Sequence, residues 1–395
     1  MSGGSTAGEV RSWVETHADD LVAFRRHLHA NPEVSGAEHE TTSMIVERLS
    51  AAGFAPVVLG SGTGLVCDVG DPAAAPAVAL RADIDGLAMN DDKDVAYRSR
   101  RAGVAHACGH DVHTATVLGA GLALAPGLRE SAQAVRLVFE PSEERVPGGA
   151  VEVIGEGWLE GIRAVYGLHC DPKLDVGTVG TRRGPITSAA DQVLITLHGP
   201  GGHTARPHLT VDMVAVASRL ALDLPPLVDK LADGEVLVVF GAIAAGDAPN
   251  VIPTSARLGG SLRTPDRDVW AVAQTLVVDA VESLLADSGA EWEVEHHRGV
   301  PPVVNHDRET TVLEDAVRAV LGDDALAVTP QSTGGDSYAW YLEATGGTFA
   351  RLGTHTPGNP ERLDLHRGDF DVDEAAIGIG VEVLAGAVTR ELGLP

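Results

Sequence analysis

Apolar residues recur at helical spacing near the start of the chain, and Asn31-Pro32 ends the pattern. The apolar positions are Val10, Trp13, Val14, Leu21, Phe24 and Leu28. This spacing predicts a helix over residues 10–28. A second amphipathic stretch predicts a helix over residues 38–52, where Gly53 is a natural C-terminal stop.

Short apolar runs rich in Val and Leu come next, at residues 77–81, 134–139 and 164–168. Such runs, without alternation, are typical of strands buried on both faces, in a sheet covered by helices. Polar side chains follow each run directly. The pattern therefore predicts an α/β fold with functional groups at the ends of its strands.

The middle of the chain changes to alternating apolar and polar positions, beginning with a half-buried strand over residues 192–198. The patterns after it predict a helix at 210–224, strands at 235–245 and 255–263, a helix at 266–285 and a strand at 291–297. This βαββαβ order is that of a ferredoxin-like unit.

The α/β pattern resumes with a helix from about residue 310 and ends with a helical segment at 372–392. The ferredoxin-like unit is therefore predicted to be an insertion. The predicted domains are residues 1–187, the inserted residues 188–302, and residues 303–395. The two crossings between them, at 187–190 and 299–304, are expected to act as hinges.

Composition and charge narrow the classes of function. A chain of 395 residues that is 44% hydrophobic is not disordered as a whole, and its formal charge of −27 argues against nucleic acid or an anionic membrane as partner. No run of 18 apolar residues predicts a membrane span. Three cysteines and an N-terminus unlike a signal peptide predict a reducing, cytoplasmic location.

The densest chemical cluster lies at residues 106–113, which hold three imidazoles, a thiol and a carboxylate. Its side chains are His106, Cys108, His110, Asp111 and His113. A Cys-x-His pair can place a thiolate and an imidazole on one metal ion or on two adjacent ones. Surface histidines beside a buried cysteine are the alternative, but this density favours a metal or catalytic site.

Glu143 and Glu144 lie just past the predicted strand 134–139. Their adjacency allows one carboxylate to bind a metal while its neighbour faces a metal-bound water. A Glu-Glu pair elsewhere would more often be a solvated loop.

Three further strand-end groups have open roles on residues alone. His169, which directly follows 164–168, is either a ligand or a buried hydrogen-bonded residue. Asp83 and Asp85 follow 77–81 and could orient a ligand, or Asp85 could merely cap a turn. His366, beside Asp364, is ambiguous.

Six motifs in order carry a family resemblance over essentially the whole chain. They are residues 80–87, 106–113, 143–144, 201–207, 250–253 and 365–366. The sequence resembles the amidohydrolase branch of the aminoacylase and carboxypeptidase G metallopeptidase family, which includes hippurate hydrolases, N-acetyl-diaminopimelate deacetylases and indole-acetyl-amino-acid hydrolases. The resemblance implies an α/β, two-metal exopeptidase-like catalytic domain, with helices on both sides of a mixed sheet, interrupted by a ferredoxin-like lid.

The resemblance also implies roles for individual residues. Glu143 matches the general base and Asp83 a supporting carboxylate. The implied ligands of two divalent ions (manganese, zinc, cobalt or nickel) are Cys108, His110, Glu144, His169 and His366.

In the lid, His203 matches a residue that reaches the partner subunit's active site and stabilises the oxyanion, so a homodimer through the lid is expected. Asn250 and Arg263 match positions that bind the substrate's carboxylate end or its reacting carbonyl.

The implied activity is hydrolysis of the amide bond of an N-acyl amino acid or related small amide, by metal-activated water with a glutamate general base. A metallo-carboxypeptidase or dipeptidase of the same family is the first alternative. More remote are a cysteine amidase, with Cys108 as nucleophile and His110 or His113 as base, and a non-catalytic binding protein.

The sequence departs from the branch at three places. Leu87 is followed by Ala-Met-Asn-Asp rather than Pro-Ile-x-Glu, Glu140 replaces a usual glutamine, and residues 334–338 replace a Glu-Asp-Phe string. These changes keep every implied ligand but can reshape the pocket, so the sequence does not specify the acyl group or the amino acid.

Overall fold

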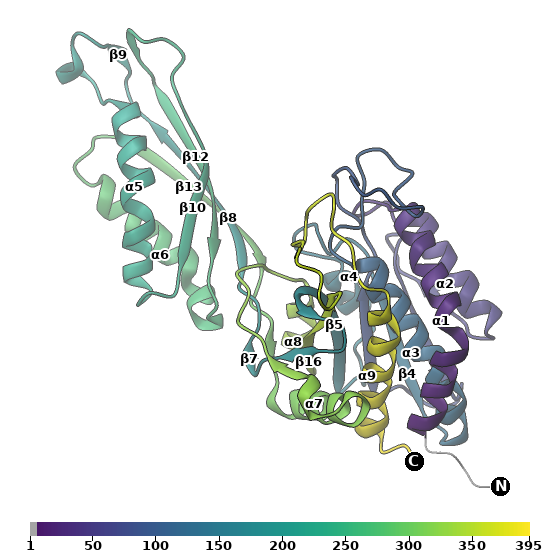
Figure 1. Ribbon diagram of the computed structural model, residues 1–395. Helices are drawn as coiled ribbons and strands as arrows, with labels where there is room; N and C mark the ends of the chain where they lie inside the picture. The colour runs from purple at the N-terminus through teal and green to yellow at the C-terminus, as the bar shows by residue number, and fades with distance from the viewer. Residues whose placement is uncertain (1–5) are drawn as a thin grey trace. The chain divides into compact units, whose positions relative to one another are not determined.

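A computed structural model describes residues 6–395, which form two compact units (Figure 1). The first unit comprises residues 6–186, 304–330 and 336–395, and the second comprises residues 187–303 and 331–335. Each unit has its own hydrophobic core. None of the helices in residues 6–395 is long and apolar enough to cross a membrane.

The first unit is built on an eight-stranded mixed sheet of strand order β1-β2-β4-β3-β5-β16-β6-β15. The strands are β1 (Val57–Val58), β2 (Leu65–Gly70), β3 (Val78–Asp83), β4 (Ala134–Glu140), β5 (Ala164–Asp175), β6 (Val179–Thr181), β15 (Leu326–Val328) and β16 (Gly346–His355). The four central strands β4, β3, β5 and β16 run parallel. Their carboxyl ends therefore share one edge, where open α/β sheets bind ligands.

Helices cover both faces of this sheet, as predicted. They are α1 (Thr6–Ala30), α2 (His39–Ala51), α3 (His110–Glu130), α4 (Ala150–Gly155), α7 (Asp307–Leu321), α8 (Tyr338–Ala344) and α9 (Ala375–Leu392). Tyr166 in β5 donates to Glu391 of α9, whereas a Cβ on the next residue, Gly167, would lie 2.5 Å from Tyr338 of α8. Because successive strand residues point to opposite faces, α9 and α8 lie on opposite sides.

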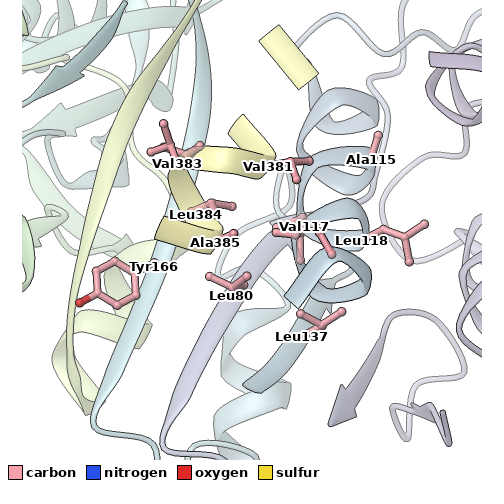
Figure 2. Close-up of a cluster of buried hydrophobic side chains, with 14 of the residues drawn as sticks. Leu80, Ala115, Val117, Leu118, Leu137, Tyr166, Val381, Val383, Leu384 and Ala385 are labelled. Carbon is pink, nitrogen blue, oxygen red and sulfur yellow. The ribbon is translucent and has the colours of Figure 1, made fainter. Parts of the chain in front are cut away.

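Apolar side chains of α3 and α9 form the core against the sheet (Figure 2). Leu118 of α3 and Leu384 of α9 are fully buried there with Leu80 of β3 and Leu137 of β4. This packing fixes α3, whose first residue is His110, against the central strands.

The first three predicted strands of the sheet end later than predicted. Strand β5 continues from the predicted 164–168 to Asp175, because its later residues still pair with β16, including His169 opposite Arg351. His169 therefore lies inside a strand and does not follow it. Asp83 is the last residue of β3.

The second unit has the predicted βαββαβ order, with an antiparallel sheet of strand order β10-β12-β8-β13. Its elements are β8 (Ala190–His198), α5 (Met213–Leu231), β10 (Leu237–Ala245), β12 (Ser255–Arg263), α6 (Arg267–Leu285) and β13 (Glu291–Val300). Helix α5 extends past the predicted end at 224, because Leu224 and Val228 continue its buried face. The helix therefore includes Pro225 and Pro226. A small ladder joins β9 (Gly202–His203) to β11 (Val251–Ile252).

Candidate metal centre

The five implied ligands all lie in the first unit. Cys108 and His110 flank Gly109, the N-cap of α3, which has a left-handed backbone with φ of 89°. A Cβ at this position would lie 2.7 Å from the Cys170 sulfur, so glycine is required both by conformation and by space. This tight turn brings the two implied ligands of the Cys-x-His sequence close to each other.

The ligand atoms gather at the carboxyl edge of the sheet. The Cys108 sulfur is 3.4 Å from His169 Nε2, and Glu144 Oε1 is 3.2 Å from His366 Nε2 and 3.8 Å from His110 Nε2. Two groups whose ligand atoms lie within 4.8 Å of one another share the thiol: Cys108, His110 and His169, and Cys108, Glu144 and His366. A third group joins His110 to both glutamates.

These residues fit divalent cations. The Nε2 atom of His110 is buried and has no hydrogen-bond partner, although several carboxylates surround it. A buried acceptor without a partner is costly, and a cation at this position would satisfy it. Mixed thiolate, imidazole and carboxylate ligands suit zinc and other first-row metals.

Neighbouring groups set the tautomers of two ligands. His110 Nδ1 donates to Asp85 Oδ1 at 3.2 Å, and His169 Nδ1 donates to the Cys170 carbonyl at 2.7 Å. In both rings Nε2 then carries the lone pair that a metal requires. Asp85 Oδ2 also accepts from Ser35 and from the backbone N–H of Glu144, at 2.6 and 3.0 Å, so one carboxylate holds two implied ligands.

Asp83 lies among the ligands but has a different set of contacts. Its Oδ1 is 2.6 Å from His113 Nδ1, and Oδ2 accepts from Arg81 at 2.8 Å. Because His113 Nε2 accepts the Cys170 N–H at 2.8 Å, its Nδ1 is the donor to Asp83. Both nitrogens of His113 are thus hydrogen-bonded within the protein. The hydrogen-bonded pair of Asp83 and His113 lies next to the implied ligands and helps to position them.

Arg81 is a feature that the sequence analysis missed. Its guanidinium is fully buried and donates to Glu140, Asp83 and Ser337. The backbone N–H of Ser337 in turn donates to Glu143 Oε1 at 3.2 Å. The sequence does carry a sign of this role, because Arg81 is a charged residue inside the apolar run 77–81.

The surroundings of the site shift several pKa values. Burial, together with the carboxylates of Asp336 and Glu144, raises the pKa of Glu143 well above its usual range. Burial also raises the pKa of the Cys108 thiol. For His110, burial lowers the pKa, but the Asp83 carboxylate and Cys108 more than offset this and the net pKa is raised. A carboxylate with a raised pKa is suited to proton transfer near neutral pH.

His366 has a left-handed backbone, with φ of 60°, which is uncommon for a residue other than glycine. Its N–H donates to the Ala107 carbonyl at 2.8 Å, which ties its loop to the segment preceding Cys108. Strained backbone of this kind is often found at functional sites.

The three lid residues lie in the second unit and do not form one cluster there. His203 in β9 is exposed, and the Asn250 carbonyl accepts the Thr204 N–H at 3.4 Å, so His203 and Asn250 are neighbours in the fold. Arg263 is at the far end of β12, about 26 Å along the strand from Ser255 at about 3.3 Å per residue. There it donates to the Thr333 carbonyl and lines a hollow of about 480 Å³.

A mixed α/β sheet whose carboxyl edge gathers thiol, imidazole and carboxylate ligands defines a hydrolase of the metallopeptidase class. Residues 79–390 match the peptidase family M20/M25/M40, and the chain belongs to this family. The predicted family and the α/β fold are thereby confirmed.

Individual relatives agree with this assignment. The chain is 36% identical over 367 residues to the N-acetyl-L-cysteine deacetylase of Bacillus subtilis, covering 92% of this chain and 86% of that protein. A solved Bacillus subtilis structure, described as a dinuclear metal-binding peptidase of the M20 family, is similar with a TM-score of 0.83 and 29% identity, covering 95% of this chain and 99% of that one.

A Rhodococcus jostii protein whose name describes a glutamate–cysteine ligase is 44% identical over 387 residues. The match covers 96% of this chain but 48% of that protein, so this chain spans about half the length of that relative.

Proposed function

We propose that the protein hydrolyses the amide bond of an N-acyl amino acid or related small amide, with two divalent cations held by Cys108, His110, Glu144, His169 and His366. The observation that carries the proposal is the position of Glu143, whose carboxylate lies with His110 and Glu144 in one candidate metal-binding group, its Oε2 4.0 Å from His110 Nε2. The similarity to a deacetylase of an N-acetyl amino acid supports the substrate class.

When bound in such a site, divalent cations would polarise a carbonyl and lower the pKa of water toward about 7. Glu143 then accepts the proton of the attacking water and returns it to the leaving amine. Ser337 holds Glu143 Oε1 through its backbone N–H, which leaves Oε2, 4.0 Å from His110 Nε2, on the side of the ligands.

The test is Glu143→Gln with metal content and turnover measured on the same sample. Glu143→Gln is expected to retain about two metal ions per chain and to lose at least 100-fold in kcat, in the range of about 10²–10⁴ for general base catalysis. Glu130→Gln, an exposed carboxylate at the end of α3, is the matched control. Normal turnover in a metal-loaded Glu143→Gln protein would contradict the proposed base.

Chelation distinguishes metal hydrolysis from a cysteine amidase. Since Cys108 is buried and its thiol pKa is raised, it is poorly suited to act alone as a nucleophile. Loss of activity with a chelator and recovery with manganese, zinc, cobalt or nickel is the expected result. Activity that resists chelation but is blocked by thiol alkylation would favour the amidase.

Dipeptides belong in the same substrate panel, because a metallo-carboxypeptidase or dipeptidase would cleave them in preference to N-acyl amino acids. Binding of N-acyl amino acids without any turnover would instead favour a non-catalytic binding protein.

A homodimer through the second unit is also part of the proposal. Strand β10 is at the edge of its sheet, and three of its apolar side chains, Leu237, Val239 and Ile243, are each about half exposed. An apolar edge strand can pair with its copy about a twofold axis. Val239→Lys is then expected to be monomeric in analytical ultracentrifugation. If the wild-type protein is active as a monomer, the proposed role of His203 as oxyanion donor to a partner subunit is wrong.

Asn250 and Arg263 are proposed to bind the substrate's carboxylate end or its reacting carbonyl. Their separation within the second unit supports different roles for the two residues. A cytoplasmic location is proposed because Cys67, Cys108 and Cys170 are all free thiols.

A further inference from the structure

Arg351 stands out in strand β16 because it is partly exposed in a strand that is otherwise buried. Apart from Arg351, all residues of the strand from Gly347 to His355 are buried. A long cationic side chain in such a strand must reach solvent or an anion, because burying an unpaired charge is costly.

The Arg351 side chain lies on the face of the sheet that carries the candidate metal centre. Its Cα pairs with that of His169 in the parallel β5–β16 ladder, and paired strand residues point to the same face. The guanidinium carbon lies 5.6 Å from the centroid of the Phe349 ring, and this ring meets the His169 ring edge-on, with centroids 6.0 Å apart. Arg351 is thus a neighbour of an implied metal ligand.

Among the described residues, no carboxylate lies within ion-pair distance of this guanidinium. Within residues 6–395, Arg351 makes no hydrogen bond or ion pair, and its guanidinium lies over the Phe349 ring. Arg81, in strand β3 of the same sheet, shows the usual pattern, because three side chains accept hydrogen bonds from it. The five donors of Arg351 are free to receive a ligand.

The positive charge also reaches the groups around the general base. Burial chiefly lowers the pKa of His169, and the charge of Arg351 adds to this effect. Burial raises the pKa of Asp336, and Arg351 partly opposes the rise. Asp336 is itself one of the carboxylates that raise the pKa of Glu143.

The aromatic support gives the guanidinium a fixed position. A guanidinium over an aromatic ring keeps its edge free for a planar, two-point contact with a carboxylate. Opposite Arg351 in the antiparallel ladder is Gly180, where a Cβ would lie 2.9 Å from Leu174 Cδ1, so the strands pack closely at the base of the arginine side chain.

We propose that Arg351 is a specificity-determining residue that binds a carboxylate of the substrate while the amide lies at the metal centre. This inference rests on the proposed amidase function and deepens it, because it makes the preferred substrates anionic. The carboxylate could be the α-carboxylate of the amino acid, a side-chain carboxylate, or one carried by the acyl group.

Three matched substrate pairs distinguish these sources, since the two members of each pair differ in one carboxylate. The pairs are an N-acetyl amino acid and its α-amide, N-acetylglutamate and N-acetylglutamine, and an N-succinyl and an N-butyryl amino acid. The wild-type protein and Arg351→Met are assayed with all six. Arg351→Lys tests whether charge alone is sufficient, and Arg318→Met, a surface arginine of α7, is the control for the loss of one positive charge.

The expected result is a loss of about 10- to 100-fold in kcat/KM for the carboxylate member of one pair, mostly through KM, with little change for its neutral partner. Arg351→Lys should retain part of the preference. The pair that responds identifies the carboxylate. An equal loss for both members of every pair, or no loss, would overturn the inference.

Metal content and the thermal unfolding midpoint are measured for each variant, so that loss of folding is not mistaken for loss of recognition. If Arg351→Met does not fold, the substrate pairs are assayed with Arg351→Lys and Arg351→Gln instead. A wild-type protein that cleaves none of the six amides when loaded with metal contradicts the proposed function itself. One that cleaves them without any dependence on residue 351 contradicts only the role of Arg351.

Discussion

Replacing Asp85 with asparagine is expected to weaken metal binding without removing any proposed ligand. Asp85 is almost completely buried, and its two oxygens accept from His110 Nδ1, the Ser35 hydroxyl and the Glu144 N–H. Asparagine offers one acceptor oxygen and an NH₂ group that cannot accept. At least one of these three donors therefore loses its partner.

The size of the effect follows from these contacts. A hydrogen bond to a charged group contributes about 1.5–3 kcal/mol. Loss of a group that orients a metal-bound histidine lowers affinity about 10- to 100-fold, or about 1.4–2.7 kcal/mol. The lower limit applies if the asparagine oxygen still accepts from His110, and the upper limit if the amide turns and His110 adopts the wrong tautomer.

The assay is competition for zinc or manganese between the protein and a chromophoric chelator, with circular dichroism to verify folding. Asp68→Asn is the matched control, because it makes the same change in a half-exposed carboxylate that pairs with Arg136 on the surface. Equal metal affinity in folded Asp85→Asn and wild-type protein would refute the assignment of Asp85 as the group that orients His110.

Further predictions concern stability and thiol reactivity. Gly109→Ala should lower the free energy of unfolding in urea by at least 2 kcal/mol, since it combines a left-handed backbone with a Cβ 2.7 Å from the Cys170 sulfur. Its control is Gly103→Ala, where φ is 76° but no atom lies within 4 Å, and the loss of unfolding free energy should be about 1–2 kcal/mol. Leu197→Ala in the core of the second unit should cost about 2–5 kcal/mol and leave metal affinity unchanged; a fall in affinity would show that the units depend on each other. Burial raises the pKa of Cys67 to about 12, so this thiol should resist alkylation at pH 8 until urea unfolds the protein, and rapid labelling of the native state would contradict its burial.

Much of the fold could be predicted from local patterns. Helical spacing at 10–28 and 38–52 predicted α1 and α2 to within a few residues, because one face of each helix packs on the core. Alternation in the middle of the chain predicted the βαββαβ unit, since its sheet is covered on one face only. Boundaries that depend on a distant partner were less accurate, as the continuation of β5 alongside β16 shows.

The candidate site divides in the same way. Cys108 and His110, and Glu143 and Glu144, were recognisable because the residues of each pair are neighbours in the sequence, and the family resemblance added His169 and His366. The structure adds that all six lie in one unit, in overlapping groups of three whose ligand atoms lie within 4.8 Å of one another. Their roles as ligands and base stay predictions for the experiments above.

The sequence by itself determined the fold class, the family and the chemical nature of the proposed ligands, because periodicity and short motifs are properties of neighbouring residues. Only the tertiary structure decided what orients and surrounds those ligands. Asp85 joins His110 to Glu144, Ser337 reaches Glu143 across 194 positions, and Arg351 lies beside His169 through a strand pairing. Such contacts depend on which strands lie side by side and on where each strand ends, and no local pattern in the chain specifies either.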